Sequence, residues 1–314
     1  MSLRDLRLFL GGALNIGAAR VLNAARPARP VTPLSLEGYL GLAAPEPLDT
    51  VRLLEGRSNR DRLATLLRLL EARGIPHRRL PYRSLEGSGE NLVLEAGTDG
   101  RVLLLAGHHD AVPGSPGAND NAAAVAILLR LLERLLDDPP RRFRVRVVIF
   151  GDEEKGFLGS RAYVRAAPLD DLLGVVSLEL CGIGDGLALW DVEPEAGSRL
   201  ARAFAATAEA LGYRRDEGYH LVGRIPLFGS DHRPFAARGI PAYGLTVIPN
   251  AAREALRSFI FRPLRPALLL PARRPPPFRT YHTPLDRADT LEPAALGRVG
   301  ALLEALCREL DTGA

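Results

Sequence analysis

The chain is poor in cysteine. Cys181 and Cys307 are the two cysteines among its 314 residues, and they lie far apart with no CxxC spacing. This argues against a disulfide framework and against a thiolate zinc site, because both need several cysteines at short spacings. Any metal ion in this protein would need histidine and carboxylate ligands.

Lysine is scarcer still, since Lys155 is the only one and arginine carries nearly all of the positive charge. We interpret this as the bias of an arginine-rich proteome. The net charge of +4 at pH 7 is spread among interspersed acidic residues, which is weak evidence for nucleic-acid binding. We therefore expect no nucleic-acid partner, and the sequence leaves the oligomeric state open.

Long apolar runs are also missing. No uninterrupted stretch approaches the roughly 18 residues of a membrane span, so we expect no stable span. Near the N-terminus the apolar stretch contains Asn15 and Arg20, and Asp5 lies where a signal peptide carries its positive charge. We expect an amphipathic N-terminal helix and a cytoplasmic protein. A signal peptide cut near "NAA" at 23–25, and hence a secreted or periplasmic protein, is the alternative.

The sequence does contain an alternation of short apolar runs with stretches of helical spacing. The apolar runs predict strands at residues 91–96, 101–107, 143–151, 173–181, 186–192 and 241–248. The spacing predicts helices at about residues 59–74, 119–136, 157–166, 195–212 and 291–311. Apolar strands separated by helices indicate an α/β protein, a three-layer α/β/α fold with a central mixed, largely parallel sheet.

The length suits one large domain preceded by an arm. Residues 1–45 are helix-like and then rich in proline, which predicts an N-terminal arm, and residues 46–314 then form a single domain. Residues 257–280 are dense in proline and arginine and fit neither the helical nor the strand period. They predict a long irregular loop within that domain.

Polar residues follow the predicted strands, and in such folds ligands bind beyond the carboxyl ends of the strands. In "GHHD", His108 and Asp110 are two apart and can share a face, where the carboxylate could accept the second N–H of a metal-bound imidazole. In "GANDN", Asp120 begins a helix and would serve as its N-cap. Asn119 and Asn121 could equally be the cap, which would free Asp120 for another task.

Carboxylates follow the next two strands. Asp152, Glu153 and Glu154 end an apolar strand, where repulsion disfavours them unless they are exposed or a cation neutralises them. Glu179 interrupts an apolar strand, and it is either an exposed edge residue or a buried group with a partner. His282 would be exposed if taken alone. Jointly, two histidines and three carboxylates with a spare glutamate have the composition of a two-ion, zinc-like site.

The ordered motifs "GHHD", "GANDNAA", "GDEEKGFLGS", "LELCG", "GSDHRPFAARGIPA" and "YHTPLDRADT" resemble those of zinc metallopeptidase family M28, which includes bacterial aminopeptidases and glutaminyl cyclases. The resemblance covers roughly residues 90 to 312. It implies a zinc-exopeptidase-like fold with a central mixed sheet flanked by helices. Residues 46–314 would then be the catalytic domain.

The resemblance also implies roles for single residues and two Zn²⁺ ions per chain. Asp120 would bridge the two ions, with His108 and Glu179 on one and with Glu154 and His282 on the other. Glu153 would be the general base that deprotonates the bridging water. Two supporting residues complete this assignment, with Asp110 behind the first histidine and Asp231 near the site, although Asp231 could also be an N-cap. Glu179 departs from the aspartate of the best-known aminopeptidases.

Three functions follow from the resemblance. The first is a two-zinc aminopeptidase that acts on peptide or aminoacyl substrates, because zinc activates water and polarises the scissile carbonyl. The second is a glutaminyl-cyclase-like acyltransferase with one zinc, and the third is a non-catalytic binding relative. The full set of predicted ligands favours the hydrolase, and the sequence leaves substrate preference open.

Overall fold

The computed structural model describes residues 3–25, 30–98, 100–193, 198–226, 228–262 and 274–312. Within these ranges eight strands form one sheet, in the order β1-β2-β4-β3-β5-β8-β6-β7. The strands are β1 (Arg78–Ser84), β2 (Gly87–Gly97), β3 (Val102–His108), β4 (Arg144–Phe150), β5 (Leu172–Leu178), β6 (Gly186–Trp190), β7 (Tyr219–Val222) and β8 (Ala242–Ile248). The strands β4, β3, β5 and β8 run parallel to one another, and the pairs β1–β2, β2–β4 and β6–β8 are antiparallel.

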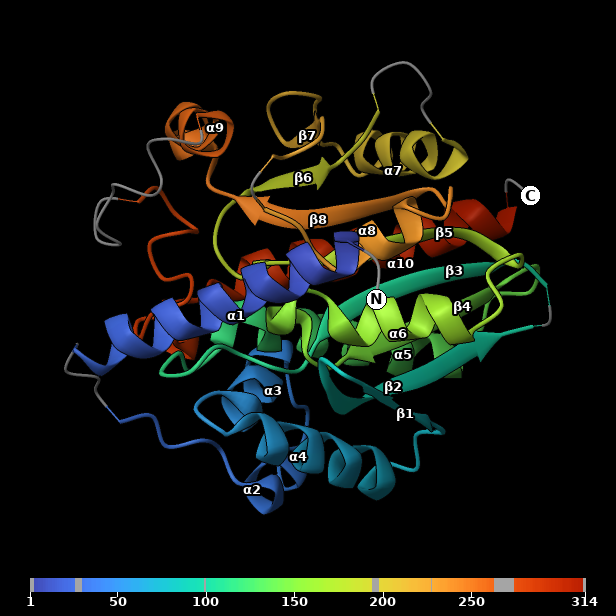
Figure 1. Cartoon of the computed structure of the whole chain (residues 1–314). Helices are drawn as coiled ribbons and strands as arrows, with labels where there is room; N and C mark the ends of the chain where they lie inside the picture. The colour runs from blue at the N-terminus through green and yellow to red at the C-terminus, as the bar shows by residue number, and fades with distance from the viewer. Residues whose placement is uncertain are drawn as a thin grey trace.

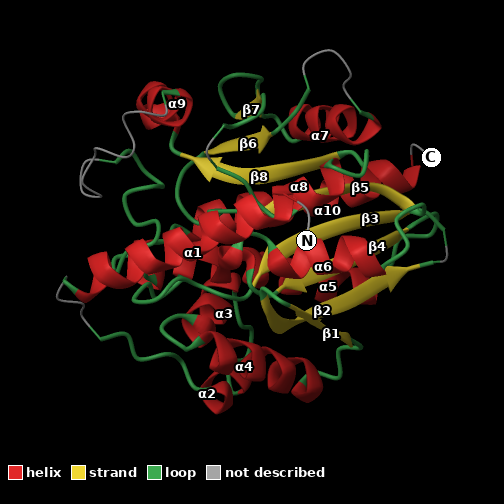
Figure 2. Ribbon diagram, viewed as in Figure 1, coloured by secondary structure: helices red, strands yellow, loops and turns green. Residues whose placement is uncertain are grey.

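Helices cover both faces of this sheet (Figures 1 and 2). The helices are α1 (Leu3–Ala24), α2 (Leu36–Leu40), α3 (Pro47–Leu54), α4 (Asn59–Ala72), α5 (Ala123–Asp137), α6 (Leu158–Ala166), α7 (Arg199–Ala210), α8 (His232–Ala236), α9 (Arg253–Phe261) and α10 (Pro293–Thr312). Short helical turns are η1 (Ala118–Ala122), η2 (Glu153–Lys155), η3 (Asn250–Ala252) and η6 (Ala288–Thr290). The predicted α/β/α fold with a mixed, largely parallel sheet is confirmed.

The two faces of the central strands enter two different cores. Along β3, Leu103 and Leu105 pack in the larger core with α3, α4, α5, α7 and α10. The intervening Leu104 and Ala106 pack with α6 and α8 on the other face. Strand side chains alternate between faces, so a strand buried on both sides must be apolar throughout. That is why the apolar runs predicted the central strands correctly.

Three details differ from the predictions. The strand predicted at 173–181 ends at Leu178, and the strand predicted at 186–192 ends at Trp190. The segment predicted to be irregular from residue 257 begins inside helix α9, whose Leu256, Phe259 and Ile260 are buried at helical spacing. Residues 263–273 of that segment, and residues 195–197 of the helix predicted at 195–212, lie outside the described residues.

The N-terminal helix α1, blue in Figure 1, lies along the face that also carries α6 and α8. Its inner side contacts the turn η2. The solvent-facing side of α1 is less polar than that of the predicted amphipathic helix, since Leu14 is 74% exposed and Val21 is 71% exposed. In the part of the chain that the structure describes, every helix is too short or too polar to cross a membrane.

Candidate metal centre

Six predicted site residues meet at one edge of the sheet. His108 ends β3, Glu153 and Glu154 form the turn η2 just after β4, and Glu179 follows β5. Because β3 lies between β4 and β5 and parallel to both, the carboxyl ends of these strands face the same side. The loop residues Asp120, in η1, and His282 complete two clusters of possible ligands. His108, Glu153 and Glu179 form the first cluster, and Asp120, Glu154 and His282 form the second.

Asp120 lies between the two clusters. Its Oδ1 is 3.2 Å from His108 Nε2, and its Oδ2 is 3.1 Å from His282 Nε2. Around His108 Nε2, a carboxylate oxygen of Glu179 lies at 3.6 Å and one of Glu153 at 3.8 Å. Around His282 Nε2, Glu154 Oε2 lies at 3.0 Å. One carboxylate therefore presents one oxygen to each of two histidine and carboxylate clusters.

The predicted supporting residue Asp110 lies behind the first histidine. His108 Nδ1 is 3.0 Å from the backbone oxygen of Asp110 and 3.4 Å from its carboxylate. The carboxylate itself accepts the backbone N–H groups of Glu153 at 3.0 Å and Glu154 at 3.1 Å. Asp110 thus fixes both the imidazole and the turn with the two glutamates. The neighbouring His109 turns away, with Nε2 3.4 Å from Glu90 O.

The second predicted supporting residue, Asp231, is fully buried, but the hydrogen bond to the cluster comes from its neighbour in sequence, Ser230. Ser160 donates a 2.5 Å hydrogen bond to Asp231 Oδ1. It is Ser230 that donates to Glu179 Oε1, at 2.6 Å. Asp231 stands at the N-cap position of α8, as the alternative expected, but within the described contacts its side chain makes no hydrogen bond that caps the helix.

Sequence reasoning missed Asp286, which supports the central carboxylate residue. Its side chain is fully buried and accepts the backbone N–H groups of Asn119 at 2.7 Å and Asp120 at 3.1 Å. Asn121, expected only as a possible cap, donates to Glu179 Oε2 at 3.2 Å. A buried aspartate needs hydrogen-bond partners, because burial without them is unfavourable. The sequence signal that could have pointed to Asp286 was the "PLD" of the last motif.

Three loops around the site hold a non-glycine residue at positive φ. These are Asp152 at 55°, directly before η2, Leu180 at 51°, directly after Glu179, and His282 at 59°. A residue with a Cβ is disfavoured there, and such strain gathers at functional sites where the surroundings enforce it. The loop conformations therefore come from the packed fold and were not readable from local sequence.

Burial and crowding shift the acidic groups strongly. Burial raises the pKa of Glu154 to about 7, with repulsion from Asp120 adding to it and His282 opposing it. Burial likewise raises the pKa of Glu153 well above its ordinary value. For His282 burial acts in the other direction and lowers the pKa, but the neighbouring carboxylates outweigh it and raise the pKa to about 10. So many ionisable groups in one buried place favour a bound cation, which would neutralise the carboxylates.

The donor atoms fit a divalent metal ion. Among the described residues, four buried atoms at the two clusters make no hydrogen bond: His108 Nε2, His282 Nε2, Asp120 Oδ2 and Glu154 Oε1. Two imidazole nitrogens with carboxylate oxygens are the ligands that zinc accepts in sites without thiolates. Both cysteines are buried and free, and burial raises the thiol pKa of each.

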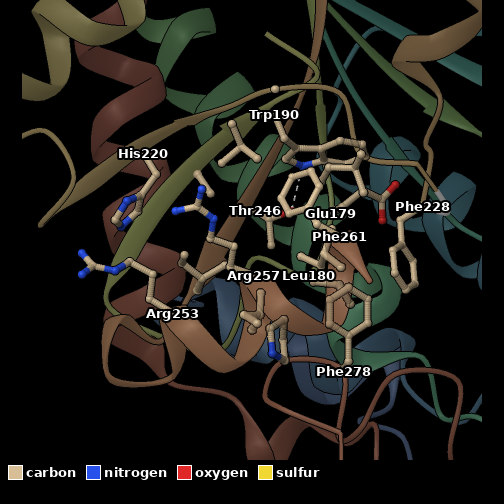
Figure 3. A pocket seen from close by; sticks show the side chains of 18 of the residues that line it. Glu179, Leu180, Trp190, His220, Phe228, Thr246, Arg253, Arg257, Phe261 and Phe278 are labelled. Atoms are coloured by element: carbon tan, nitrogen blue, oxygen red, sulfur yellow. Dashed lines mark hydrogen bonds between the residues drawn. The ribbon is translucent and has the colours of Figure 1, made fainter. Parts of the chain in front are cut away.

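A pocket of about 520 Å³ opens beside the clusters (Figure 3). Glu179 lines one end, and His220 and Arg253 lie on the opposite side of the view. Trp190 forms one wall, and its indole N–H donates to Thr246 Oγ1 at 3.0 Å. Most of the remaining lining is apolar, including Ile225, Phe228, Leu256, Ile260 and Phe278. The pocket can hold a large apolar group next to Glu179.

The fold belongs to the three-layer α/β/α class that is also found in solved zinc exopeptidases. Residues 91–307 match Peptidase family M28, and the chain belongs to that family. The predicted family resemblance is thereby confirmed.

Two curated relatives are aminopeptidases. The "Probable lipoprotein aminopeptidase LpqL" of Mycobacterium tuberculosis is 28% identical over 224 residues, which are 66% of this chain and 42% of that protein. "Aminopeptidase YwaD" of Bacillus subtilis is 41% identical over 63 residues, which are 20% of this chain and 14% of that protein. This chain thus spans less than half the length of these relatives.

Two solved structures share the fold. A zinc aminopeptidase from Bacillus subtilis superposes with a TM-score of 0.57 at 22% identity, over 72% of this chain and 51% of that one. The glutaminyl cyclase of Porphyromonas gingivalis superposes with a TM-score of 0.63 at 18% identity, over 90% of this chain and 99% of that one.

Proposed function

We propose that this protein is a metal-dependent hydrolase of peptide or amide bonds, and specifically a two-zinc aminopeptidase. The observation that carries the proposal is the position of Asp120, whose two carboxylate oxygens face His108 Nε2 and His282 Nε2 at 3.2 and 3.1 Å. A carboxylate shared by two histidines, each with further carboxylates, suits two ions held close together. The family membership and the curated aminopeptidase relatives support the same activity.

Five residues would hold the ions. His108 and Glu179 would bind one, His282 and Glu154 the other, and Asp120 both. Bound zinc lowers the pKa of water towards about 7 and polarises a carbonyl oxygen. The longer side chain of Glu179 is accommodated here, since Ser230 and Asn121 each donate a hydrogen bond to one of its oxygens.

Glu153 would act as the general base. It is buried next to the first cluster, its backbone is fixed by Asp110, and burial keeps its pKa well above the ordinary value. A raised carboxyl pKa brings the group closer to working pH, where it can accept a proton from water and return it to a leaving amine. Glu154 is fixed by the same aspartate but faces His282, which suits a ligand.

The pocket would take the N-terminal residue of the substrate. Glu179 and Tyr281 line it, and Tyr281 directly precedes His282, so the pocket adjoins both clusters. Its aromatic and aliphatic walls favour a large apolar side chain over a charged one. We therefore expect peptides and aminoacyl amides with leucine or phenylalanine at the first position to be cleaved fastest.

Two alternatives remain in view. One is a glutaminyl-cyclase-like acyltransferase with a single zinc, which the shared fold with the Porphyromonas gingivalis enzyme permits. The other is a binding relative without catalysis. Both ligand clusters are complete among the described residues, and this favours the two-ion hydrolase.

The deciding experiment combines metal content with two substrates. Protein purified without chelator and equilibrated with zinc is analysed for zinc per chain, then assayed with leucyl and phenylalanyl anilides and with glutaminyl peptides. We expect about two zinc ions and anilide hydrolysis. One ion with pyroglutamate formation would instead identify a cyclase, and no turnover of either substrate would identify a binding protein.

A further inference from the structure

The N-terminal helix α1 touches the turn that carries Glu153 and Glu154. A Cβ added to Gly12 of α1 would lie 2.5 Å from the backbone carbon of Lys155. In the reverse direction, a Cβ on Gly156 would lie 2.3 Å from the backbone oxygen of Leu8. Real side chains do not approach that closely, so helix and turn lie backbone against backbone. Any displacement of α1 therefore changes the surroundings of the two glutamates.

The same helix places one side chain on the second ligand cluster. Asn15 Oδ1 lies 3.2 Å from His282 Nδ1, and Asn15 Nδ2 lies 3.4 Å from Glu154 Oε2. In the neutral imidazole that would bind a metal, a hydrogen bond from Nδ1–H to Asn15 selects the tautomer whose unprotonated Nε2 is directed at Asp120 and Glu154. Further along α1, buried Asn23 donates to the backbone oxygen of His282 at 3.1 Å.

The first cluster is held differently. The outer nitrogen of His108, which is the ring nitrogen Nδ1 that points away from the cluster, forms a hydrogen bond with the backbone oxygen of Asp110, only two residues along the chain. The outer nitrogen of His282 bonds to a residue 267 positions away. The first histidine therefore carries its support within its own loop, whereas the second depends on the docking of a separate helix.

We propose that Asn15 is a positioning residue for the second metal subsite, so that docking of α1 sets the affinity of His282, Glu154 and Asp120 for their ion and leaves the first subsite largely unaffected. The inference rests on the proposed metal site. Its consequence is that α1 determines whether the protein works with one ion or two. Outer partners of metal-bound histidines typically change metal affinity by about 10- to 100-fold.

Two adjacent glycines offer a matched test. Gly12→Ala places a methyl group against the backbone of η2, whereas a Cβ at Gly11 meets no described atom within 4 Å. Both changes raise helix propensity equally, so their difference isolates docking. We measure zinc stoichiometry and both dissociation constants by chelator competition and calorimetry. For Gly12→Ala we expect one tight ion and a second bound about 10- to 100-fold more weakly. For Gly11→Ala we expect two tight ions, as in the wild type.

A second pair tests the side chain itself. Asn15→Leu removes both hydrogen bonds at similar volume, and Leu14→Asn changes a neighbour that is 74% exposed. Asn15→Leu should weaken the second ion alone, and Leu14→Asn should weaken neither. Hydrogen exchange of the α1 amides should in turn slow when the second ion binds, because coupling between two sites is reciprocal.

The outcomes separate this inference from the proposed function. Two tight ions in the wild type and in both Gly12→Ala and Asn15→Leu would overturn the role of α1 while leaving the two-zinc site intact. Equal weakening of both ions in these variants would overturn it too, since the effect would then be general. A wild type that binds fewer than two ions would overturn the two-zinc proposal itself.

Discussion

Neighbouring glutamates in η2 are assigned different tasks by what surrounds each. Glu153 and Glu154 are both buried, and Asp110 accepts a hydrogen bond from the backbone of each. Their side chains then diverge, one towards His108 at 3.8 Å and the other towards His282 at 3.0 Å. Removing the charge of either should therefore have distinct consequences.

We predict that Glu153→Gln lowers kcat for a leucyl anilide by roughly 100- to 10,000-fold while two zinc ions stay bound, because the loss is that of a general base. Glu154→Gln should instead release one zinc ion during dialysis, because a ligand is lost. Steady-state kinetics and elemental analysis of the two variants check this. If Glu153→Gln loses zinc and keeps the activity of zinc-saturated enzyme, the two roles are assigned the wrong way round.

Asp191 follows β6 and links it to α8. Its carboxylate accepts hydrogen bonds from His232 at 3.1 Å, from Arg233 at 2.8 Å and from the backbone of Ile225 at 2.9 Å. Burial alone would raise the pKa of Asp191, but these donors outweigh it and hold the pKa well below the ordinary value. The carboxylate therefore stabilises the fold at every pH at which it is ionised in both the folded and the unfolded chain.

The sign of the pH dependence follows from the lowered pKa. The contribution of Asp191 is fully present above the unfolded pKa of about 4 and is lost as the pH falls below it. Asp191→Asn should cost roughly 1.5 to 3 kcal/mol of unfolding free energy at pH 7, the range for hydrogen bonds to charged groups. The difference from the wild type in urea midpoint should be constant from pH 5 to 8 and shrink near pH 3. A difference that grows on acidification would contradict this.

Four of the six residues in the two clusters, His108, Glu153, Glu154 and Glu179, end or follow apolar strands, whereas Asp120 and His282 were found through the ordered motifs. His108 and Glu154 follow buried runs whose direction in the sheet could be anticipated, so the meeting of their loops could be too. Asn15 gave no such signal, because its contact with His282 spans 267 positions and depends on how α1 docks. The role of Asp286 could not be read from its motif for the same reason, since its partners lie 166 and 167 positions away.

At the scale of elements, glycine decides where backbones can touch. In α6, a Cβ on Gly159 would lie 2.3 Å from the backbone oxygen of Gly151 and 2.5 Å from Asn91 Oδ1. Asn91 also donates to the backbone oxygen of Gly159 at 3.0 Å, so α6 is fixed directly against β2 and the end of β4. In α10, by contrast, a Cβ on Gly297 would meet no described atom within 4 Å.

We therefore predict opposite effects of the same substitution in two helices. Gly297→Ala should raise the free energy of unfolding by about 0.5 to 1 kcal/mol, because alanine loses less backbone entropy on folding. Gly159→Ala should lower it, because α6 must move away from fixed backbone atoms. Thermal unfolding followed by circular dichroism compares the two variants with the wild type. Stabilisation by both would show that the packing of α6 yields more readily than its contacts indicate.

The elements that could be predicted share one property, which is burial on both faces. Strands β3, β4 and β5 are nearly all buried, so their sequences are mostly apolar, with Arg144 and Arg146 in β4 and Ser177 in β5 as the polar exceptions before the strand ends. Strand β1, with sequence RRLPYRS, is largely exposed at the edge of the sheet and carries no such pattern. The predicted start of the irregular segment at 257–280 was wrong, because the prolines and arginines beyond residue 261 obscured the helical spacing of α9.

On the scale of the whole molecule, the proposed ions would join loops that the sheet alone leaves separate. The ligands come from the ends of β3, β4 and β5, from η1 and from the loop before η6, over residues 108 to 282. Without bound ions, these loops bring together buried carboxylates that repel one another. Metal ions that bind only the folded chain should therefore stabilise it as a unit.

We predict that removing metal with a chelator lowers the unfolding temperature and that zinc restores it in two steps as its concentration rises. Free zinc at 100 times the dissociation constant of one site stabilises the folded state by about 2.7 kcal/mol. For a chain of this size each kcal/mol corresponds to roughly 2 to 4 °C, so filling one site should raise the midpoint by several degrees. Magnesium at the same concentration should do far less, because imidazole ligands suit zinc better. An unfolding temperature unchanged by chelator and zinc would mean that the two histidines hold no ion in the folded chain.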